Sequence, residues 1–344
     1  MLGRRRKNDL ENRILDDRKN KKTPDSRNFV QKTKDLYQSQ TENWLLLQDG
    51  IQNLSETKTK VFSEANAQVI LQYNPQRIRS TAANLNPDSV AHRACFLCSE
   101  NLPEGQKAMV VEKQFLLLCN PYPIFREHFT VVNVEHLRQQ ISGYLENLLN
   151  IARSVSPEFS IFYNGPECGA SAPDHLHFQI CPRNSTPLEK EYGLNTKAIT
   201  TIFDSSQISV SATKSLGRNY FTIVSSQKNK LIEIFDFLYD LLSEMYSAVE
   251  EPMLNIFAWY TSGNWIIKIF PREKHRPDQY YREGNEQWLI SPAAVDLAGL
   301  IITPSENNFN MLKLEDIKNI FSQVTISNEY FEYLIVKLKR YLEN

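Results

Sequence analysis

The sequence has no uninterrupted apolar run long enough to cross a bilayer, so no transmembrane helix is expected. It also lacks an excess of charge of either sign, with 39 Lys and Arg against 40 Asp and Glu and a formal net charge of −1. A balanced chain lacks the overall positive field that nucleic-acid binders use. Neither nucleic acid nor a membrane is therefore an expected partner.

Cysteine is scarce too, with five residues and no dense disulfide spacing, which indicates a reducing compartment. The N-terminus carries a basic run, Arg4–Lys7, but no apolar segment follows it, and Asp9 and Glu11 are unlike a transit peptide. We interpret this region as a solvated leader and expect a cytoplasmic protein.

The chain of 344 residues, 41% hydrophobic and 23% charged, suits a globular protein of two domains or one large domain with an internal repeat. Residues 28–55 are predicted to be helical, and residues 1–57 form a leader and helix. Residues 58–73, 115–119 and 128–134 are predicted to be extended, and 189–215 to form a linker and lid.

A helix–strand–turn–strand unit occurs twice. The first copy comprises a helix over 137–152, the breaker Ser156–Pro157, and strands over 159–163 and 175–183. The second comprises a helix over 231–249, the breaker Glu251–Pro252, and strands over 254–259 and 265–272. Aligning Ile180–Arg183 with Ile269–Arg272 places Gln179 on Lys268 and His177 on Ile266. We interpret this as a duplication with one active copy, over residues 58–200, and one degenerate copy, over 201–344.

Two of the six histidines lie in His175-Leu-His-Phe-Gln179. In a strand, residues two apart share a face, so His175, His177 and Gln179 are expected to line up on one side. The small residues of 164–171 would let backbone N–H groups approach a phosphate. Because neutral imidazole attacks phosphorus without prior activation, His177 is a candidate nucleophile.

A Cys-x-x-Cys motif, Cys95 and Cys98, is compatible with zinc binding, redox chemistry or chance. Zinc would need two further ligands, for which His136 and His175 are candidates. Such a site would hold the His175 backbone and thereby aim His177.

These motifs resemble the histidine-triad superfamily, in the branch of galactose-1-phosphate uridylyltransferase, diadenosine tetraphosphate phosphorylase and the GDP-hexose phosphorylases. The resemblance runs from about Asn74 to Arg183, with a weaker echo through Arg276. It implies an α+β fold of two tandem histidine-triad-like units, each an antiparallel sheet with packed helices. The second unit is degenerate, and a helical segment precedes both.

The resemblance also assigns roles. His177 matches the nucleophile, and the ligands of a structural zinc match Cys95, Cys98, His136 and His175. The phosphate and nucleotide contacts match Asn164, Ser171 and Gln179, and basic loop residues match Arg77 and Arg79. We also expect the backbone of Gly169 and Ala170 to donate to the phosphate. The iron site of some uridylyltransferases is expected to be absent, because it needs several histidines and His275 is the one histidine after His177.

Gln179 bears on the acceptor. The hydrolytic members of the superfamily carry a third histidine where this chain has Gln179, and an amide offers no titratable proton. We therefore expect transfer to orthophosphate or a sugar phosphate in preference to water.

The predicted function is a nucleotidyltransferase of the phosphorylase type that acts on a nucleoside diphosphate sugar through a nucleotidyl-histidine. The alternatives are a dinucleoside polyphosphate phosphorylase (an adenylyltransferase) and, from another class, a non-catalytic nucleotide sensor. A homodimer is compatible with the resemblance.

Two features keep two interpretations. The first is a basic and aromatic patch that comprises Trp265, Lys268, Arg272, Lys274, His275 and Arg276. It contacts the terminal phosphate of the nucleotide or the acceptor anion in one interpretation, and in the other it is a solvated end of a strand. His128, at the start of a strand, either touches phosphate or fills a buried polar gap.

Overall fold

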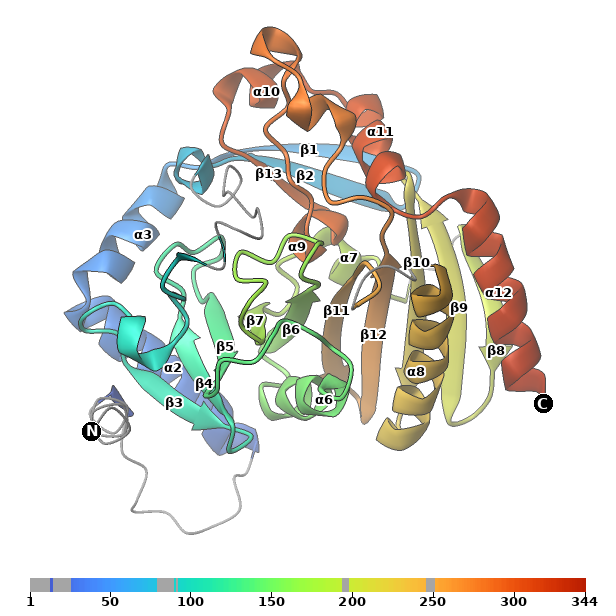
Figure 1. Ribbon diagram of the computed structural model, residues 1–344, viewed down its shortest axis with the longest axis horizontal. Helices are drawn as coiled ribbons and strands as arrows, with labels where there is room; N and C mark the ends of the chain where they lie inside the picture. The colour runs from blue at the N-terminus through green and yellow to red at the C-terminus, as the bar shows by residue number, and fades with distance from the viewer. Residues whose placement is uncertain (1–12, 15–25, 79–89, 91, 194–197, 246–250) are drawn as a thin grey trace.

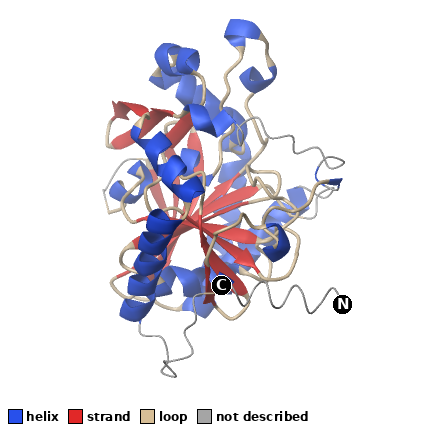
Figure 2. Ribbon diagram, turned by 90° about the vertical axis from the view of Figure 1, so that its left-hand side faces the viewer, coloured by secondary structure: helices blue, strands red, loops and turns tan. Residues whose placement is uncertain are grey.

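The computed structural model describes residues 13–14, 26–78, 90, 92–193, 198–245 and 251–344. They form an α+β protein with a ten-stranded sheet, a separate three-stranded sheet, and helices on both faces of the strands (Figures 1 and 2). Among these residues no helix has the length and apolar character needed to span a membrane. Most of the predicted leader and Arg79 lie outside the described residues.

The strands are β1 (Lys58–Glu64), β2 (Ala67–Tyr73), β3 (Ala108–Val111), β4 (Phe115–Cys119), β5 (Phe129–Asn133), β6 (Phe159–Asn164), β7 (His177–Pro182), β8 (Ile199–Asp204), β9 (Ile208–Ser215), β10 (Arg218–Ser225), β11 (Leu254–Thr261), β12 (Asn264–Pro271) and β13 (Leu300–Thr303). The helices are α2 (Ser26–Asn43), α3 (Leu45–Ser55), α6 (Leu145–Ser154), α7 (Pro187–Lys190), α8 (Lys228–Met245), α9 (Ala294–Leu297), α10 (Glu306–Met311), α11 (Leu314–Val324) and α12 (Asn328–Glu343). Short 3₁₀ turns are η1 (Pro75–Arg77), η2 (Ser99–Asn101), η3 (Asp278–Tyr281) and η4 (Gly284–Glu286).

The large sheet consists of two halves with the same topology. Its strand order is β3-β4-β5-β7-β6-β11-β12-β10-β9-β8, and all neighbours are antiparallel. In each half, one helix connects the third and fourth strands along the chain: α6 follows β5, and α8 follows β10. The β6–β11 pair joins the halves. This is the arrangement expected of two tandem units.

The strand register gives the same alignment of the two units as the sequence. Thr130 pairs with Gln179 in the first half, and Thr222 pairs with Lys268 in the second. Gln179 and Lys268 therefore occupy equivalent positions.

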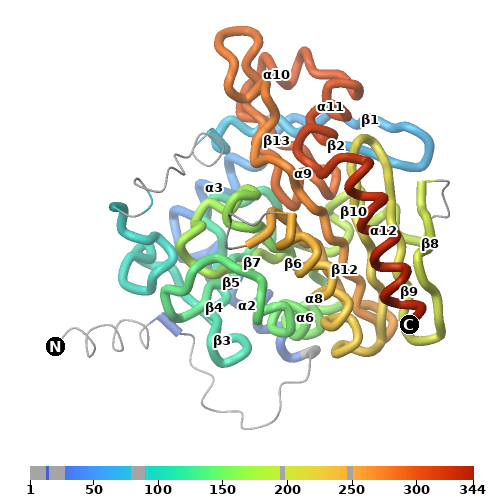
Figure 3. The backbone as a smooth tube through the Cα atoms, turned by 45° about the vertical axis from the view of Figure 1, so that its right-hand side comes forward, coloured from blue at the N-terminus to red at the C-terminus, as the bar shows by residue number. Residues whose placement is uncertain are grey.

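Two layers cover the large sheet. Helices α2, α6, α8 and α12 pack on one face, and Figure 3 shows α12 beside β8 and β9. The small sheet, in which β2 lies between β1 and β13, packs with α9 and α11 on the other face (Figure 1). In β7, Phe178 and Ile180 point into the core beneath the first layer, so the alternation of a strand turns His177 and Gln179 to the opposite face.

Some expectations need correction. The segment predicted as a linker, 189–215, contains strands β8 and β9. The sequence does not predict β8, because this edge strand is largely exposed and lacks clear alternation. The helix predicted over 137–152 begins at Leu145, because the preceding residues form a loop that contacts β7. Strands β1 and β2 lie outside the large sheet, and the division of the chain after residues 57 and 200 stays a prediction.

Candidate functional site

A cavity of about 450 Å³ lies on the face of the large sheet that carries His177 and Gln179. Its floor comes from β4 to β7, and its walls come from the loop after Cys95, the loop over 169–172 and the segment over 275–302. The cavity therefore combines residues of the first half with a segment that follows the second half.

His177 is presented to this cavity in one tautomer. Its Nδ1 lies 2.8 Å from the His175 carbonyl oxygen, which is an acceptor, so Nδ1 carries the proton and donates. The lone pair is then on Nε2. Burial lowers the pKa of His177 to about 4, which keeps the ring neutral near pH 7. A neutral imidazole with a directed lone pair is a competent nucleophile.

Gln139, in the loop before α6, holds the backbone at this position. Its Oε1 accepts from the His177 N–H at 2.8 Å, and its Nε2 donates to the carbonyl oxygens of Asn164 at 2.8 Å and His177 at 3.1 Å. One side chain thus joins the end of β6 to the start of β7. No pattern in the sequence marks this residue, because a single glutamine in a loop is not distinctive.

His128 orients Gln179. The Ile124 N–H donates to His128 Nδ1 at 3.3 Å, so the ring proton lies on Nε2 and is donated to Gln179 Oε1 at 2.9 Å. With its oxygen engaged, Gln179 turns its NH₂ group toward the cavity that it lines. His128 itself is 1% exposed and is absent from the cavity wall. Of the two interpretations of His128, the geometry favours the buried one.

The loop after β6 approaches the cavity through its backbone. Gly169, Ala170 and Ser171 line the cavity, as does Asn164 at the end of β6. Gly169 has φ +96°, in the region that favours glycine, and a Cβ there would lie 2.6 Å from that of Ala293. The close packing of this loop against Ala293 therefore requires glycine, and the approach of its backbone to a phosphate stays a prediction.

Cationic side chains from distant segments meet at the wall. Arg77, Arg93 and Arg276 line the cavity together with His275. Arg93 donates to Asp174 and to the Ser171 carbonyl oxygen, which ties the loop to the segment before Cys95.

The predicted basic patch therefore divides. His275 and Arg276 reach the cavity wall, but Lys268 does not. Lys268 is buried on β12, where its Nζ lies 5.0 Å from the Tyr220 ring centroid, and burial lowers its pKa to about 7. The prediction that Lys268 binds substrate has no support from this position.

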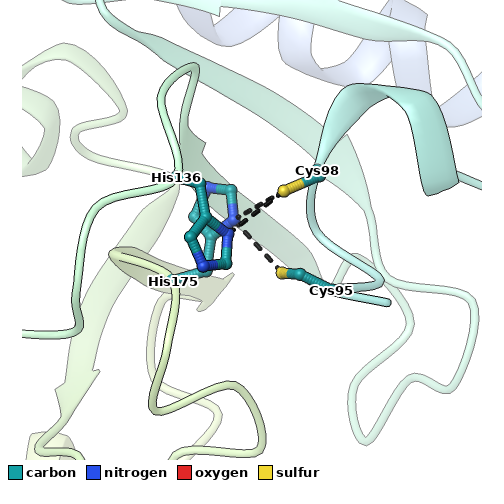
Figure 4. A group of neighbouring side chains, drawn as sticks. All are labelled: Cys95, Cys98, His136 and His175. Carbon is teal, nitrogen blue, oxygen red and sulfur yellow. Dashed lines mark hydrogen bonds between the residues drawn. The ribbon is translucent and has the colours of Figure 1, made fainter. Parts of the chain in front are cut away.

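Beside the cavity, Cys95, Cys98, His136 and His175 form one cluster (Figure 4). Their ligand atoms all lie within 4.8 Å of one another. Individual separations are 3.3 Å from Cys95 Sγ to His175 Nδ1 and 3.2 Å from Cys98 Sγ to His136 Nδ1. Ligands about 2.0–2.3 Å from a tetrahedral ion lie about 3.3–3.8 Å apart, so this set fits a metal ion.

A hydrogen bond to the backbone orients His175 within the cluster. His175 Nε2 donates to the Asn133 carbonyl oxygen at 2.8 Å, which leaves the Nδ1 lone pair for a metal. His175 lies just before β7 and is absent from the cavity wall. His175 and His177 thus do not share a role on one face, as their spacing suggested: the first turns to the metal cluster and the second to the cavity.

Comparisons with known proteins find similar sequences for part of the chain and a similar fold for most of it. A family model described as a domain of unknown function (DUF4922) matches residues 36–182. A galactose-1-phosphate uridylyltransferase from Clostridium acetobutylicum is 28% identical over 126 residues, covering 31% of this chain. The chain spans a quarter of the length of that relative.

Solved structures of yeast Ap4A phosphorylase share the fold over nearly their whole length. One superposes with a TM-score of 0.60 at 15% identity and covers 87% of this chain and 98% of the yeast chain. The complex with AMP gives a TM-score of 0.56 at 16% identity, covering 87% and 96%.

The chain is therefore similar in fold to yeast Ap4A phosphorylase and, over a segment of its first half, similar in sequence to a galactose-1-phosphate uridylyltransferase. Both likenesses are to the kinds of protein that the motifs of the sequence resemble.

Proposed function

We propose that this protein is a nucleotidyltransferase of the phosphorylase type, and that His177 carries the nucleotidyl group between two half-reactions. The observation that carries the proposal is the tautomer of His177, whose Nε2 lone pair belongs to a buried, neutral ring on the wall of a large cavity. The substrate is a nucleoside diphosphate sugar, and the acceptor is orthophosphate or a sugar phosphate.

In the first half-reaction, His177 Nε2 attacks the α-phosphorus. An N–P bond forms, the P–O bond to the sugar phosphate breaks, and the sugar phosphate leaves with the electron pair of that bond. In the second, an oxygen of the acceptor phosphate attacks the same phosphorus and the N–P bond breaks. The leaving group is a phosphate anion in the first half-reaction and the neutral imidazole of His177 in the second. Neither needs to take up a proton as it leaves, so little proton transfer is required.

Donors around the cavity suit the charge that develops on the phosphoryl oxygens. These are the NH₂ groups of Gln179 and Asn164, the backbone of the loop over 169–171, and the side chain of Ser171. Preorganised donors of this kind are often worth about 3–4 kcal/mol each. Arg77 and Arg276 would balance the charge of the remaining phosphates.

The cluster of Cys95, Cys98, His136 and His175 would hold a structural zinc ion, because two thiolates and two imidazoles suit zinc. Zinc would fix the position of His175, whose carbonyl oxygen sets the tautomer of His177. The proposed metal acts through position and takes no part in bond making.

A dinucleoside polyphosphate phosphorylase is the second candidate. It is favoured by the likeness of fold to yeast Ap4A phosphorylase over most of both chains. The two candidates share the His177 chemistry and differ in what leaves from the α-phosphorus.

Intact-mass measurement after incubation with UDP-glucose, GDP-glucose or Ap4A tests the proposal. We expect a covalent increment of one nucleoside monophosphate with one of these probes, labile to acid and discharged by orthophosphate. The increment should be absent in His177→Ala, and free imidazole should restore turnover in His177→Gly. Tight binding of a probe without any adduct would contradict the enzymatic proposal and favour a sensor.

A further inference from the structure

Asn164 faces the cavity in a single orientation. Its Oδ1 accepts from Asn255 Nδ2 at 2.9 Å and from the backbone N–H of Ala294 at 2.8 Å. Because both partners donate, the oxygen must point toward them. The Nδ2 group donates to no described protein atom and belongs to a side chain that lines the cavity. The amide therefore offers hydrogen-bond donors, and no acceptor, to whatever the cavity binds.

The orientation of Asn255 is fixed in turn by Arg272. Nη1 of Arg272 donates to Asn255 Oδ1, and a guanidinium group has no acceptor atom. Asn255 must therefore direct its NH₂ group away from Arg272, where it donates to Asn164 Oδ1 and to the Cys168 carbonyl oxygen at 2.8 Å. Asn255 is fully buried, so water cannot replace these partners.

Arg272 is itself immobilised. Its side chain is fully buried and donates to the carbonyl oxygens of Pro292, Val324, Lys274 and His275 at 2.9–3.0 Å. Rotation of the guanidinium would leave several of these buried carbonyl groups unpaired, at a cost of about 1–3 kcal/mol each. Arg272 is thus the fixed end of a chain of hydrogen bonds that runs to the cavity.

We propose that Asn255 and Arg272 are positioning residues that set the polarity of Asn164, so that its NH₂ group faces the transferred phosphoryl group. Both belong to the half of the sheet without histidines, which thereby takes part in the site. This inference rests on the proposed function for the identity of the ligand. The direction of the hydrogen bonds does not depend on it.

The first half offers a matched control. Arg183 follows β7 as Arg272 follows β12, and the register places the two arginines at equivalent positions. Arg183 donates to Glu189 Oε1, however, and has no hydrogen bond to Asn255 or Asn164. An arginine-to-lysine substitution at each position therefore compares the same change with and without a connection to Asn164.

A double-mutant cycle tests the proposal on the rate of adduct formation with the probe that labels His177. Asn255→Asp keeps the size of the side chain and its attraction to Arg272 but has no donors, so Asn164 Oδ1 keeps only the Ala294 N–H and faces a carboxylate oxygen. We expect about a 10- to 100-fold loss of rate. The same change should have almost no effect in an Asn164→Ala background. Arg272→Lys should slow the reaction and Arg183→Lys should not.

The proposal would be overturned if Asn255→Asp lowered the rate of adduct formation equally in the wild type and in Asn164→Ala. The effect of Asn255 would then not pass through Asn164. Melting temperatures and circular dichroism show which variants remain folded.

A second measurement does not depend on activity. In protein labelled with ¹⁵N-asparagine, the Asn164 side-chain NH₂ signals, assigned by their loss in Asn164→Ala, should exchange rapidly with water. Those of Asn255 should be protected. Asn255→Asp should slow exchange at Asn164, because its amide can then turn to donate to the new carboxylate. Protected Asn164 signals in the wild type would refute the proposed orientation even if no probe labels the protein. Absence of label alone would refute only the proposed function.

Discussion

Phe162 and Phe257 stack face to face at the junction of the two halves, with ring centroids 5.9 Å apart and ring planes 4° apart. They pair in register between β6 and β11. Within its own half, Phe162 pairs with Gln179 and Phe257 pairs with Lys268. The two phenylalanines are therefore equivalent residues that meet on the approximate twofold axis between the units.

The same symmetry shows which described residues of the second half occupy the position that the cavity takes in the first half. Ile266 is the residue equivalent to His177. It packs with Trp259, Tyr220 and Phe270 in the hydrophobic core under the small sheet. Bulky side chains fill the space that the first half leaves open. Lys268 is buried there and is absent from the lining of the cavity.

Removal of the imidazole at position 128 should slow adduct formation. His128→Leu fills a similar space beside Phe125 and Phe162 but cannot donate to Gln179 Oε1. A neutral hydrogen bond is worth about 1 kcal/mol, so we expect a loss of roughly 5- to 10-fold in rate. Single-turnover labelling measures it. An unchanged rate would show that Gln179 needs no such orientation.

Zinc binding should depend on the four clustered residues and on no other cysteine. Cys98→Ser should reduce metal content from one zinc per chain to a small fraction and lower the melting temperature. Cys119→Ala is the control, since Cys119 is buried on β4 away from the cluster. Elemental analysis of the purified proteins decides the matter. Full zinc content in Cys98→Ser would exclude the proposed ligand set.

Most residues of this site could be predicted from local patterns in the sequence. The Cys-x-x-Cys motif with His136 and His175 is brought together as expected, and the alternation of β7 directs His177 and Gln179 to one face. Hydrophobic periodicity also located the repeated unit, because its strands and helices are buried on defined faces.

Residues that act through long-range contacts could not be predicted. Asn255 and Gln139 are ordinary polar residues in the sequence, and their roles come from which strand ends meet in the fold. The sequence places Arg272 only in a basic patch, whereas in the fold its side chain is fully buried and acts as a fixed donor. The segment over 275–302 lines the cavity because of the way the chain folds back on the first half, which no local sequence pattern predicts.

The stability of the protein should depend on pH through Glu251. Burial raises the pKa of this carboxyl to about 8, although hydrogen bonds from the Tyr163 hydroxyl and the Ile141 N–H oppose the shift. Between about pH 4.5 and 8 the folded state therefore holds a proton that the unfolded state has released. Stability then falls as pH rises, by about 1.4 kcal/mol per pH unit from this group.

Urea unfolding at pH 5.5, 6.5 and 7.5 tests this dependence. Glu251→Gln stays neutral and can donate to the Tyr163 hydroxyl while it accepts from Ile141, so its stability should fall less with pH than that of the wild type. Tyr163→Phe removes a hydrogen bond that lowers the pKa and should extend the decline to higher pH. Parallel curves for Glu251→Gln and wild type would rule out this role.

Gly169 should tolerate no side chain, for two separable reasons. An alanine there would adopt φ near +96°, which costs about 1–2 kcal/mol, and its Cβ would lie 2.6 Å from that of Ala293. Gly143 provides the comparison, because it has φ +78° but no atom within 4 Å of the added Cβ. Gly143→Ala should lower the melting temperature by a few °C, and Gly169→Ala by clearly more. Adding Ala293→Gly should recover part of the loss at position 169 and none at position 143. Equal losses at the two glycines would mean that the loop moves away from Ala293 at no cost, and that its close approach to the cavity wall is not fixed.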